Sequence, residues 1–274
     1  MKLATLFPDE DYCFHLRLER GTVRGFFEAG EGASERIAER RRWLSAVPGR
    51  HAALLPEATP MLDELVDLCG EVNAFDAEGL AEVRRGGSPL GRCLELGSRW
   101  EPDFLLLKAE SEGGFRLRGG CVCFPSSWSL IPKMGQSVSG IHEVVPGLNP
   151  ALGSRIDRFL RRLNPDCSWE RYNWGLSRSA ELNQDPSRKL PRLDSGVGLD
   201  EIWLRAEHQA FVTLPRSGGV LFAIRMIVRS LQEIRCEPQI AVPLARALRT
   251  MPEAVAEYKG FGGARPRILD LMKT

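Results

Sequence analysis

The sequence predicts an α+β fold, in which an antiparallel sheet carries helices on one face and further helices flank it at both ends. Three observations predict it. Residues 28–95 are rich in helical periodicity, five segments between residues 103 and 231 are typical of strands, and a helical block separates the second of these segments from the third. Two strands, a helical insert and three more strands are the order expected of a small sheet packed against helices.

The elements before residue 100 begin with a predicted hairpin. Residues 12–18 and 22–27 alternate apolar and polar side chains around a Glu19-Arg20-Gly21 turn. Helices are expected next: one that Ser34 caps, with Ile37, Trp43, Leu44 and Val47 on its apolar side, one over 60–73, and one over about 77–87.

The five expected strands lie in the middle of the chain, at residues 103–110, 115–124, 169–177, 201–215 and 218–231. Helices are expected over about 126–141 and 150–163, between the second and third strands, and over 243–250 and 253–258 near the end. Residues 183–199 form a long polar loop rich in Pro, Gly and Ser, and loops of this length tend to be functional or mobile.

The composition excludes several classes of partner. The 274 residues include 37 basic and 36 acidic ones, so a net charge of +1 gives no electrostatic reason to expect nucleic acid or an anionic membrane. No run of 18 apolar residues occurs, and the N-terminus lacks a signal-peptide pattern, so we expect a cytoplasmic protein. The seven cysteines are scattered without a Cys-x-x-Cys pair, which favours neither a zinc ribbon nor an iron–sulfur cluster.

Four histidines are present, and His142 stands out by its setting, because it ends a predicted helix just before the chain breaks at Pro146. Such a histidine either fills the core or caps the helix, or it faces a cavity between helix and sheet. Haem iron requires an axial donor such as imidazole together with an apolar slot. The residues by themselves leave both interpretations open.

A row of polar residues lies within the fourth predicted strand, at residues 201–215. Arg205, Glu207 and Gln209 share one face of it, while His208 takes the other, because side chains alternate along a strand. The row is either a solvated face with a surface ion pair or the lining of a buried pocket. Arg171, Asn173 and Trp174 on the preceding strand present the same choice between packing and ligand binding.

Several segments together resemble the haem-dependent oxidative N-demethylase alpha-subunit-like family. The stretch CVCFPSSWSLIPKMGQSVSGIHEVVPGLN carries a CFPS strand end, a lysine and glycine (Lys133, Gly135) and an I-H-x-x-V-P turn. The resemblance continues through RFLRRL, RYNW, LRAEHQAFVTLPRSGGVLFAIR and EYKGF, and covers roughly residues 100–261.

This resemblance implies a Per-ARNT-Sim-like sheet that grips haem b, and oxidative removal of a methyl group from a small alkylamine such as dimethylamine. Dioxygen is the oxidant, and a separate reductase supplies electrons. It implies a single haem-binding domain over 1–274, with a helical region at about 28–95, a core at about 100–235 and C-terminal helices at about 240–274. A haem or gas sensor of the same fold is the alternative function.

The resemblance also assigns site residues. His142 becomes the axial iron ligand, with His208 as its rival, and Arg205, Glu207 and Gln209 line the oxygen or substrate side. The residues expected at the cofactor are, besides His142, Lys133, Arg171, Asn173, Trp174, Arg216 and Ser217.

Overall fold

The computed structural model describes residues 6–111 and 113–273. At its centre lies a seven-stranded sheet in the order β1-β5-β6-β7-β3-β4-β2, with every neighbouring pair antiparallel. The α+β class and the antiparallel sheet are therefore confirmed. The strands are β1 (Glu19–Gly21), β2 (Ala52–Leu54), β3 (Asp103–Ala109), β4 (Phe115–Cys121), β5 (Ser168–Ser177), β6 (Trp203–Leu214) and β7 (Gly219–Ser230).

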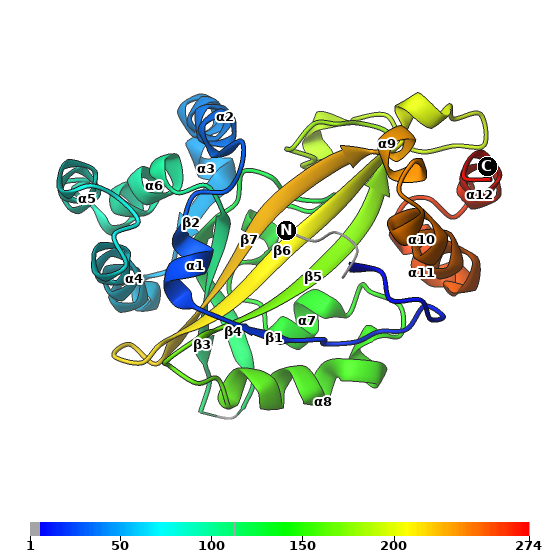
Figure 1. Cartoon of the computed structure of the whole chain (residues 1–274). Helices are drawn as coiled ribbons and strands as arrows, with labels where there is room; N and C mark the ends of the chain where they lie inside the picture. The colour runs from blue at the N-terminus through cyan, green and yellow to red at the C-terminus, as the bar shows by residue number, and fades with distance from the viewer. Residues whose placement is uncertain (1–5, 112, 274) are drawn as a thin grey trace.

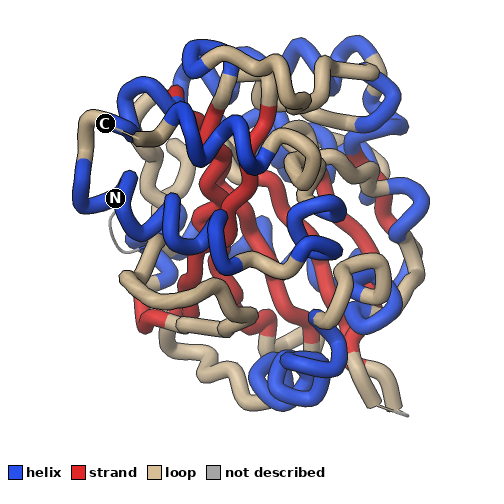
Figure 2. Tube along the Cα trace, turned by 90° about the vertical axis from the view of Figure 1, so that its right-hand side faces the viewer, coloured by secondary structure: helices blue, strands red, loops and turns tan. Residues whose placement is uncertain are grey.

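Helices surround this sheet, as the side view in Figure 2 shows. In Figure 1 the N-terminal helices gather at the left, α8 runs below the sheet, and the C-terminal helices stand at the right. The helices are α1 (Val23–Phe27), α2 (Ala33–Ala46), α3 (Pro48–His51), α4 (Thr59–Glu71), α5 (Ala77–Arg84), α6 (Pro89–Arg99), α7 (Val138–His142), α8 (Leu148–Arg161), α9 (Leu231–Arg235), α10 (Pro238–Thr250), α11 (Glu253–Tyr258) and α12 (Arg265–Leu271).

Alternation along the long strands decides which helices cover which face. Phe211 and Phe222 pack with Ile156 and Phe159 of α8 in one apolar cluster. Their neighbours in the strand point the other way, and Val212 packs in the cluster of α4 and α6. Near the start of β6, on the same face as Val212, Leu204 and Ala206 pack in the cluster of the C-terminal helices. Helices thus cover both faces of the sheet, not only the one expected.

The five strands predicted between residues 103 and 231 are all present, and the helices predicted at 60–73 and 150–163 correspond to α4 and α8. The predicted N-terminal hairpin is wrong. Residues 23–27 form helix α1, because the Thr22 hydroxyl accepts a hydrogen bond from the Gly25 N–H and caps it.

Two further expectations need correction. Gly32, and not Ser34, precedes the first turn of α2. The helical block expected at 126–141 contains only a 3-10 turn at Ile131–Lys133 and the short helix α7.

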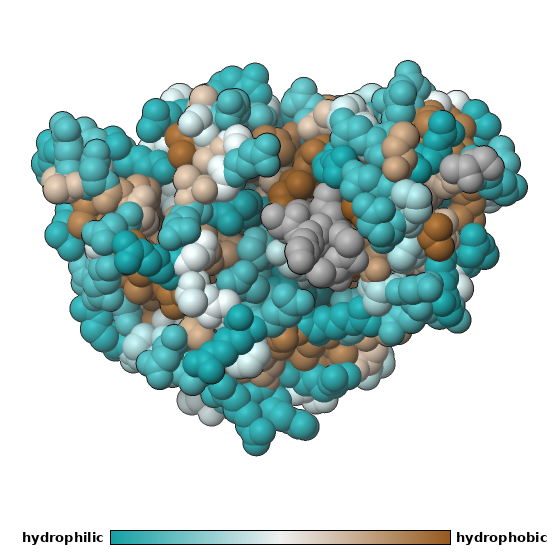
Figure 3. Space-filling model, in the orientation of Figure 1, coloured by the Kyte–Doolittle hydropathy of each residue, from teal (hydrophilic) through white to brown (hydrophobic). Residues whose placement is uncertain are grey.

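Within the described residues, no helix combines the length and the apolar character needed to cross a lipid bilayer. Hydrophilic side chains cover most of the face shown in Figure 3, and apolar ones appear in small separate areas.

Candidate functional site

The polar residues of β5 and β6 form one continuous row. In the antiparallel register Arg171 lies opposite Gln209, Asn173 opposite Glu207, and Gly175 opposite Arg205. Directly opposed residues share a face of a sheet, so the row lies on the face that α8 covers through Phe211. The expectation that Arg205, Glu207 and Gln209 share a face, with His208 on the other, is confirmed.

Glu207 is the centre of this row. Its Oε2 accepts hydrogen bonds from Gln209 Nε2 at 2.8 Å and from Asn173 Nδ2 at 3.2 Å. Beside it, burial lowers the pKa of Arg171, although Glu207 and Tyr12 act to raise it. The Nε of Arg171 is buried without a hydrogen-bond partner among the described residues. An unsatisfied guanidinium nitrogen of this kind is costly unless an acceptor reaches it.

His142 lies at the end of α7, a helix that begins where the Ser137 hydroxyl accepts the Gly140 N–H. Burial, together with the cations Arg171 and Lys133, lowers the pKa of His142 to about 4. The imidazole is therefore neutral near pH 7, and its ring nitrogens make no hydrogen bond within the described part of the chain. A neutral, uncommitted imidazole is the form that coordinates metal.

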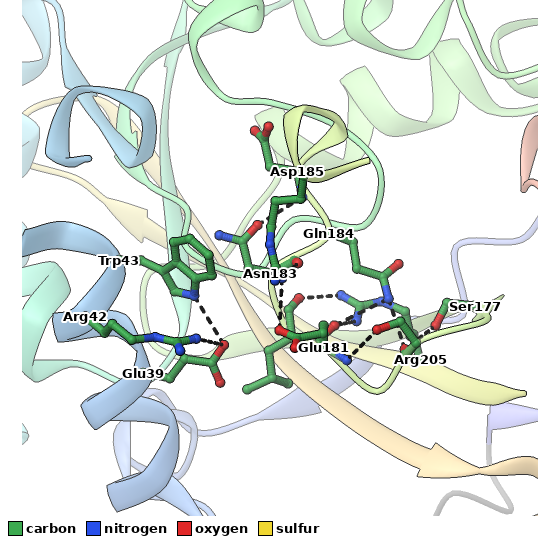
Figure 4. Close-up of polar contacts among 12 residues, drawn as sticks. Glu39, Arg42, Trp43, Ser177, Glu181, Asn183, Gln184, Asp185 and Arg205 are labelled. Atoms are coloured by element: carbon green, nitrogen blue, oxygen red, sulfur yellow. Dashed lines mark hydrogen bonds and ion pairs between the residues drawn. The ribbon is translucent and has the colours of Figure 1, made fainter. Parts of the chain in front are cut away.

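Arg205 is tied to the loop between β5 and β6 and not to the row. Its Nη1 and Nη2 donate to the carbonyl oxygens of Glu181 and Leu182 at 2.7 and 2.8 Å, and its Nε lies 3.4 Å from the Ser126 hydroxyl. Figure 4 shows the side chain pointing into this loop, with Trp43 of α2 near the loop's other side. Burial lowers the pKa of Arg205 to about 10, so it stays cationic at neutral pH.

Other predicted site residues lie elsewhere. Trp174 is on the opposite face of β5, where it stacks on Phe261. Arg216 and Ser217, in the turn after β6, donate their backbone N–H groups to the Glu64 carboxylate of α4. The Nε2 of His208 lies 2.7 Å from the Glu170 carboxylate, also on the face opposite to Arg171. The structure therefore brings together His142, Lys133, Arg171, Asn173, Glu207 and Gln209.

One comparison with known proteins decides the family. The family model of the haem-dependent oxidative N-demethylase, alpha subunit-like, matches residues 88–269. The chain belongs to this family. The match spans α6 to α12 and includes every residue of the row, while the helices before α6 precede it.

The residues around His142 fit the haem on which the N-demethylase family depends. Iron requires a neutral nitrogen donor, which His142 supplies, and haem propionates are anions that bind guanidinium and ammonium groups. Arg171 offers a buried Nε that has no partner in the described part of the chain, and Lys133 adds a second positive charge close to His142. A cavity of about 120 Å³ adjoins His142. It is below the roughly 300 Å³ at which cofactor pockets begin, so it does not itself contain a porphyrin.

A larger cleft of about 440 Å³ lies apart from the predicted site residues. It opens between α3 and the loop at residues 183–188, and its lining is Val47, Gly49, Arg50, Ser129, Ile131, Pro132, Asp185 and Ser187. Asp185 in its wall is already bonded, because it accepts from the Ser129 and Ser187 hydroxyls. This cleft therefore holds none of the residues that the family resemblance pointed to.

Two residues near the row were missed by the sequence reasoning. The Nζ of Lys259 donates to the Trp174 carbonyl oxygen at 2.6 Å, and burial lowers the pKa of Lys259 to about 8, with Glu207 opposing and Arg171 assisting the shift. His15 lies in the N-terminal segment, and burial with Arg17 and Arg171 lowers its pKa to about 4. Lys259 stands in the EYKGF segment of the family pattern, whereas nothing in the pattern around His15 signals its place.

Proposed function

We propose that this chain is the haem-binding, oxygen-dependent subunit of an oxidative N-demethylase that acts on a small alkylamine such as dimethylamine. One observation carries the proposal: the family segment supplies a neutral, uncommitted histidine, His142, beside the partly unsatisfied cation Arg171. The family description names an alpha subunit. It therefore supports partner subunits, of which we propose that one is the electron-donating reductase.

In this proposal His142 would hold the iron of haem b, and Arg171 and Lys133 would bind its propionates. Arg171 is suited to this because a guanidinium is charged at neutral pH and binds carboxylates bidentately. Haem, when bound, supplies the oxidative chemistry with dioxygen, while the protein orients and polarises.

Glu207 binds the protonated amine in this proposal. Two neighbours, Asn173 and Gln209, donate to the same carboxylate oxygen, which fixes the orientation of the group. The other carboxylate oxygen remains available as an acceptor for an alkylammonium N–H. Glu207 is only half-buried, so a small substrate can reach it from outside the apolar core.

Arg205 has a different role in this scheme from the one expected. Its donors hold backbone carbonyls of the 178–198 loop, so we propose that it anchors this loop and does not contact the oxidant. We further propose that the sheet is of the Per-ARNT-Sim type and that the chain is a single haem-binding domain. The antiparallel sheet with α7 and α8 over one face supports this.

The test is a comparison of His142→Ala with its matched control His208→Ala, both expressed with added haem. The expected result is an altered ferric and ferrous Soret band in His142→Ala and a wild-type band in His208→Ala, because His208 is held by Glu170 on the other face. An unaltered spectrum in His142→Ala would overturn the assignment of the ligand.

The catalytic half of the proposal requires a separate measurement. Formaldehyde release from dimethylamine, with dioxygen and a reductase, is expected from the wild type. In Glu207→Gln the KM for the amine is expected to rise by about one order of magnitude, because a charge pair with the ammonium group is replaced by a neutral contact. Haem binding without formaldehyde release from any small secondary amine would favour the sensor alternative.

A further inference from the structure

The small cavity that adjoins His142 is lined by two residues, Asn149 and Asp157, each with a buried side-chain oxygen that has no donor among the described residues. It lies between α7, α8 and the turn of the β3–β4 hairpin and measures about 120 Å³. Its walls are mainly apolar, and its polar residues are His142, Ser139, Asn149 and Asp157. Among the residues that the structure describes, no lysine or arginine lines it.

Each of the two acceptor residues has one atom fixed and one atom free. Asn149 donates through Nδ2 to the Ser139 carbonyl oxygen at 2.8 Å, and Asp157 accepts the Arg161 Nε on Oδ2 at 2.9 Å. The Oδ1 atoms of both residues are buried and have no hydrogen-bond partner among the described residues. A buried acceptor left unsatisfied costs about 1–3 kcal/mol, so both oxygens favour a donor within the cavity.

The His142 ring can supply such a donor, as can the Ser139 hydroxyl, which lies 3.1 Å from the Ser137 hydroxyl. An imidazole that binds iron through one nitrogen carries a proton on the other, and metal-bound histidines direct that N–H to a carboxylate, a carbonyl or a water. The Asp157 carboxylate and the Asn149 side-chain carbonyl line the same cavity as the His142 ring. Its volume also accommodates about four waters at ~30 Å³ each.

We infer that Asp157 and Asn149 position the His142 ring through waters held in this cavity. This inference rests on the proposed function, in which His142 binds iron. The two residues are positioning residues: they accept, through water, the N–H that faces away from the metal and so select one tautomer of the ring. The negative charge of Asp157 also strengthens the imidazole as a donor and stabilises the ferric state over the ferrous one.

The main variant is Asp157→Leu, which removes the acceptor, and its matched control is Arg161→Gln. The control breaks the same i,i+4 ion pair on α8 but leaves the Asp157 oxygen in the cavity. Because both side chains of that pair are partly exposed, the pair itself contributes little. A change seen in Asp157→Leu and absent from Arg161→Gln therefore belongs to the oxygen in the cavity.

Three readouts are taken on folded protein, as checked by circular dichroism. In haem-free protein, long-range ¹H–¹⁵N NMR of the His142 ring should show one tautomer in the wild type and in Arg161→Gln, and a mixture in Asp157→Leu. In haem-loaded protein, Asp157→Leu should bind haem roughly 10- to 100-fold more weakly and show a more positive ferric/ferrous midpoint potential. If Asp157→Leu does not fold, Asp157→Asn replaces it, with the same direction expected for the potential.

The outcomes separate this inference from the proposed function. An unchanged Soret band in His142→Ala removes the proposed function and this inference together. An altered band in His142→Ala, with wild-type tautomer, affinity and potential in the Asp157 variant, overturns this inference alone. Equal changes in Asp157→Leu and Arg161→Gln also overturn it, because they would trace the effect to the ion pair.

Discussion

Replacing Arg205 with methionine tests whether this arginine anchors a loop or serves the oxidant. The side chain is 2% exposed, and two of its nitrogens donate to the carbonyl oxygens of Glu181 and Leu182 at 2.7 and 2.8 Å. Hydrogen bonds from a charged group contribute about 1.5–3 kcal/mol each. Burial of the charge, which also lowers the pKa of Arg205 to about 10, offsets part of this. We therefore expect a loss of about 3 kcal/mol in the free energy of unfolding.

Urea unfolding followed by tryptophan fluorescence measures that loss, and limited proteolysis of residues 178–198 follows the loop. The matched control is Arg178→Gln. The native Arg178 holds the same loop through ion pairs with Asp194 and Glu201 at the surface. Solvent screens such pairs, so they contribute little to stability. A loss no larger in Arg205→Met than in Arg178→Gln, with no new cleavage in the loop, would refute the anchoring role and return Arg205 to the candidates for the oxygen side.

Three further predictions concern the rest of the molecule. Arg40→Met should lower the free energy of unfolding in urea by about 3–5 kcal/mol, because it leaves the buried Asp103 carboxylate without its cation. The double variant Arg40→Met/Asp103→Asn should lose less, and an equal loss in the two variants would contradict this reasoning. Gly97→Ala should cost about 1–3 kcal/mol in the same assay, because an added Cβ would lie 2.3 Å from the Cys121 Sγ; wild-type stability would show that the site relaxes. The wild type should lose stability as the pH falls from about 6.5 to about 4, because His15 takes up its proton in the unfolded chain first. In His15→Gln the loss of unfolding free energy over this pH range should be smaller than in the wild type by an amount on the order of 1 kcal/mol. If the curves of unfolding free energy against pH for the variant and the wild type are parallel, His15 does not cause the loss.

The sheet could be predicted from the sequence because its signal is local. Period-two alternation in residues 201–215 and 218–231 gives both the strands and the faces of their side chains, so the shared face of Glu207 and Gln209 followed directly. The N-terminal hairpin failed for a local reason as well. In residues 22–27 the alternation of apolar and polar side chains favours a strand, whereas the Thr22 cap favours a helix. The helix forms, and Phe26 and Phe27 are buried in it.

The site could be predicted only where the family pattern named its residues. His142 and Arg171 lie 29 positions apart in the sequence, and only the fold brings the Arg171 charge close enough to lower the pKa of His142. Asp157 forms an i,i+4 ion pair with Arg161 on α8, and in the sequence such a pair is typical of any exposed helix face. The role of Arg205 in holding a loop depends on backbone carbonyls, which no pattern of side chains reveals.

The contact of Lys259 with β5 has a consequence for the solubility of the protein. Strand β1 pairs with β5 only at residues 168–170, so the outer edge of β5 beyond them has no strand partner in the described chain. Open edges of this kind recruit strands from other molecules, and natural proteins guard them with lysines. Lys259 occupies the Trp174 carbonyl on that edge. Loss of the C-terminal helices would therefore uncover a site for edge-to-edge aggregation.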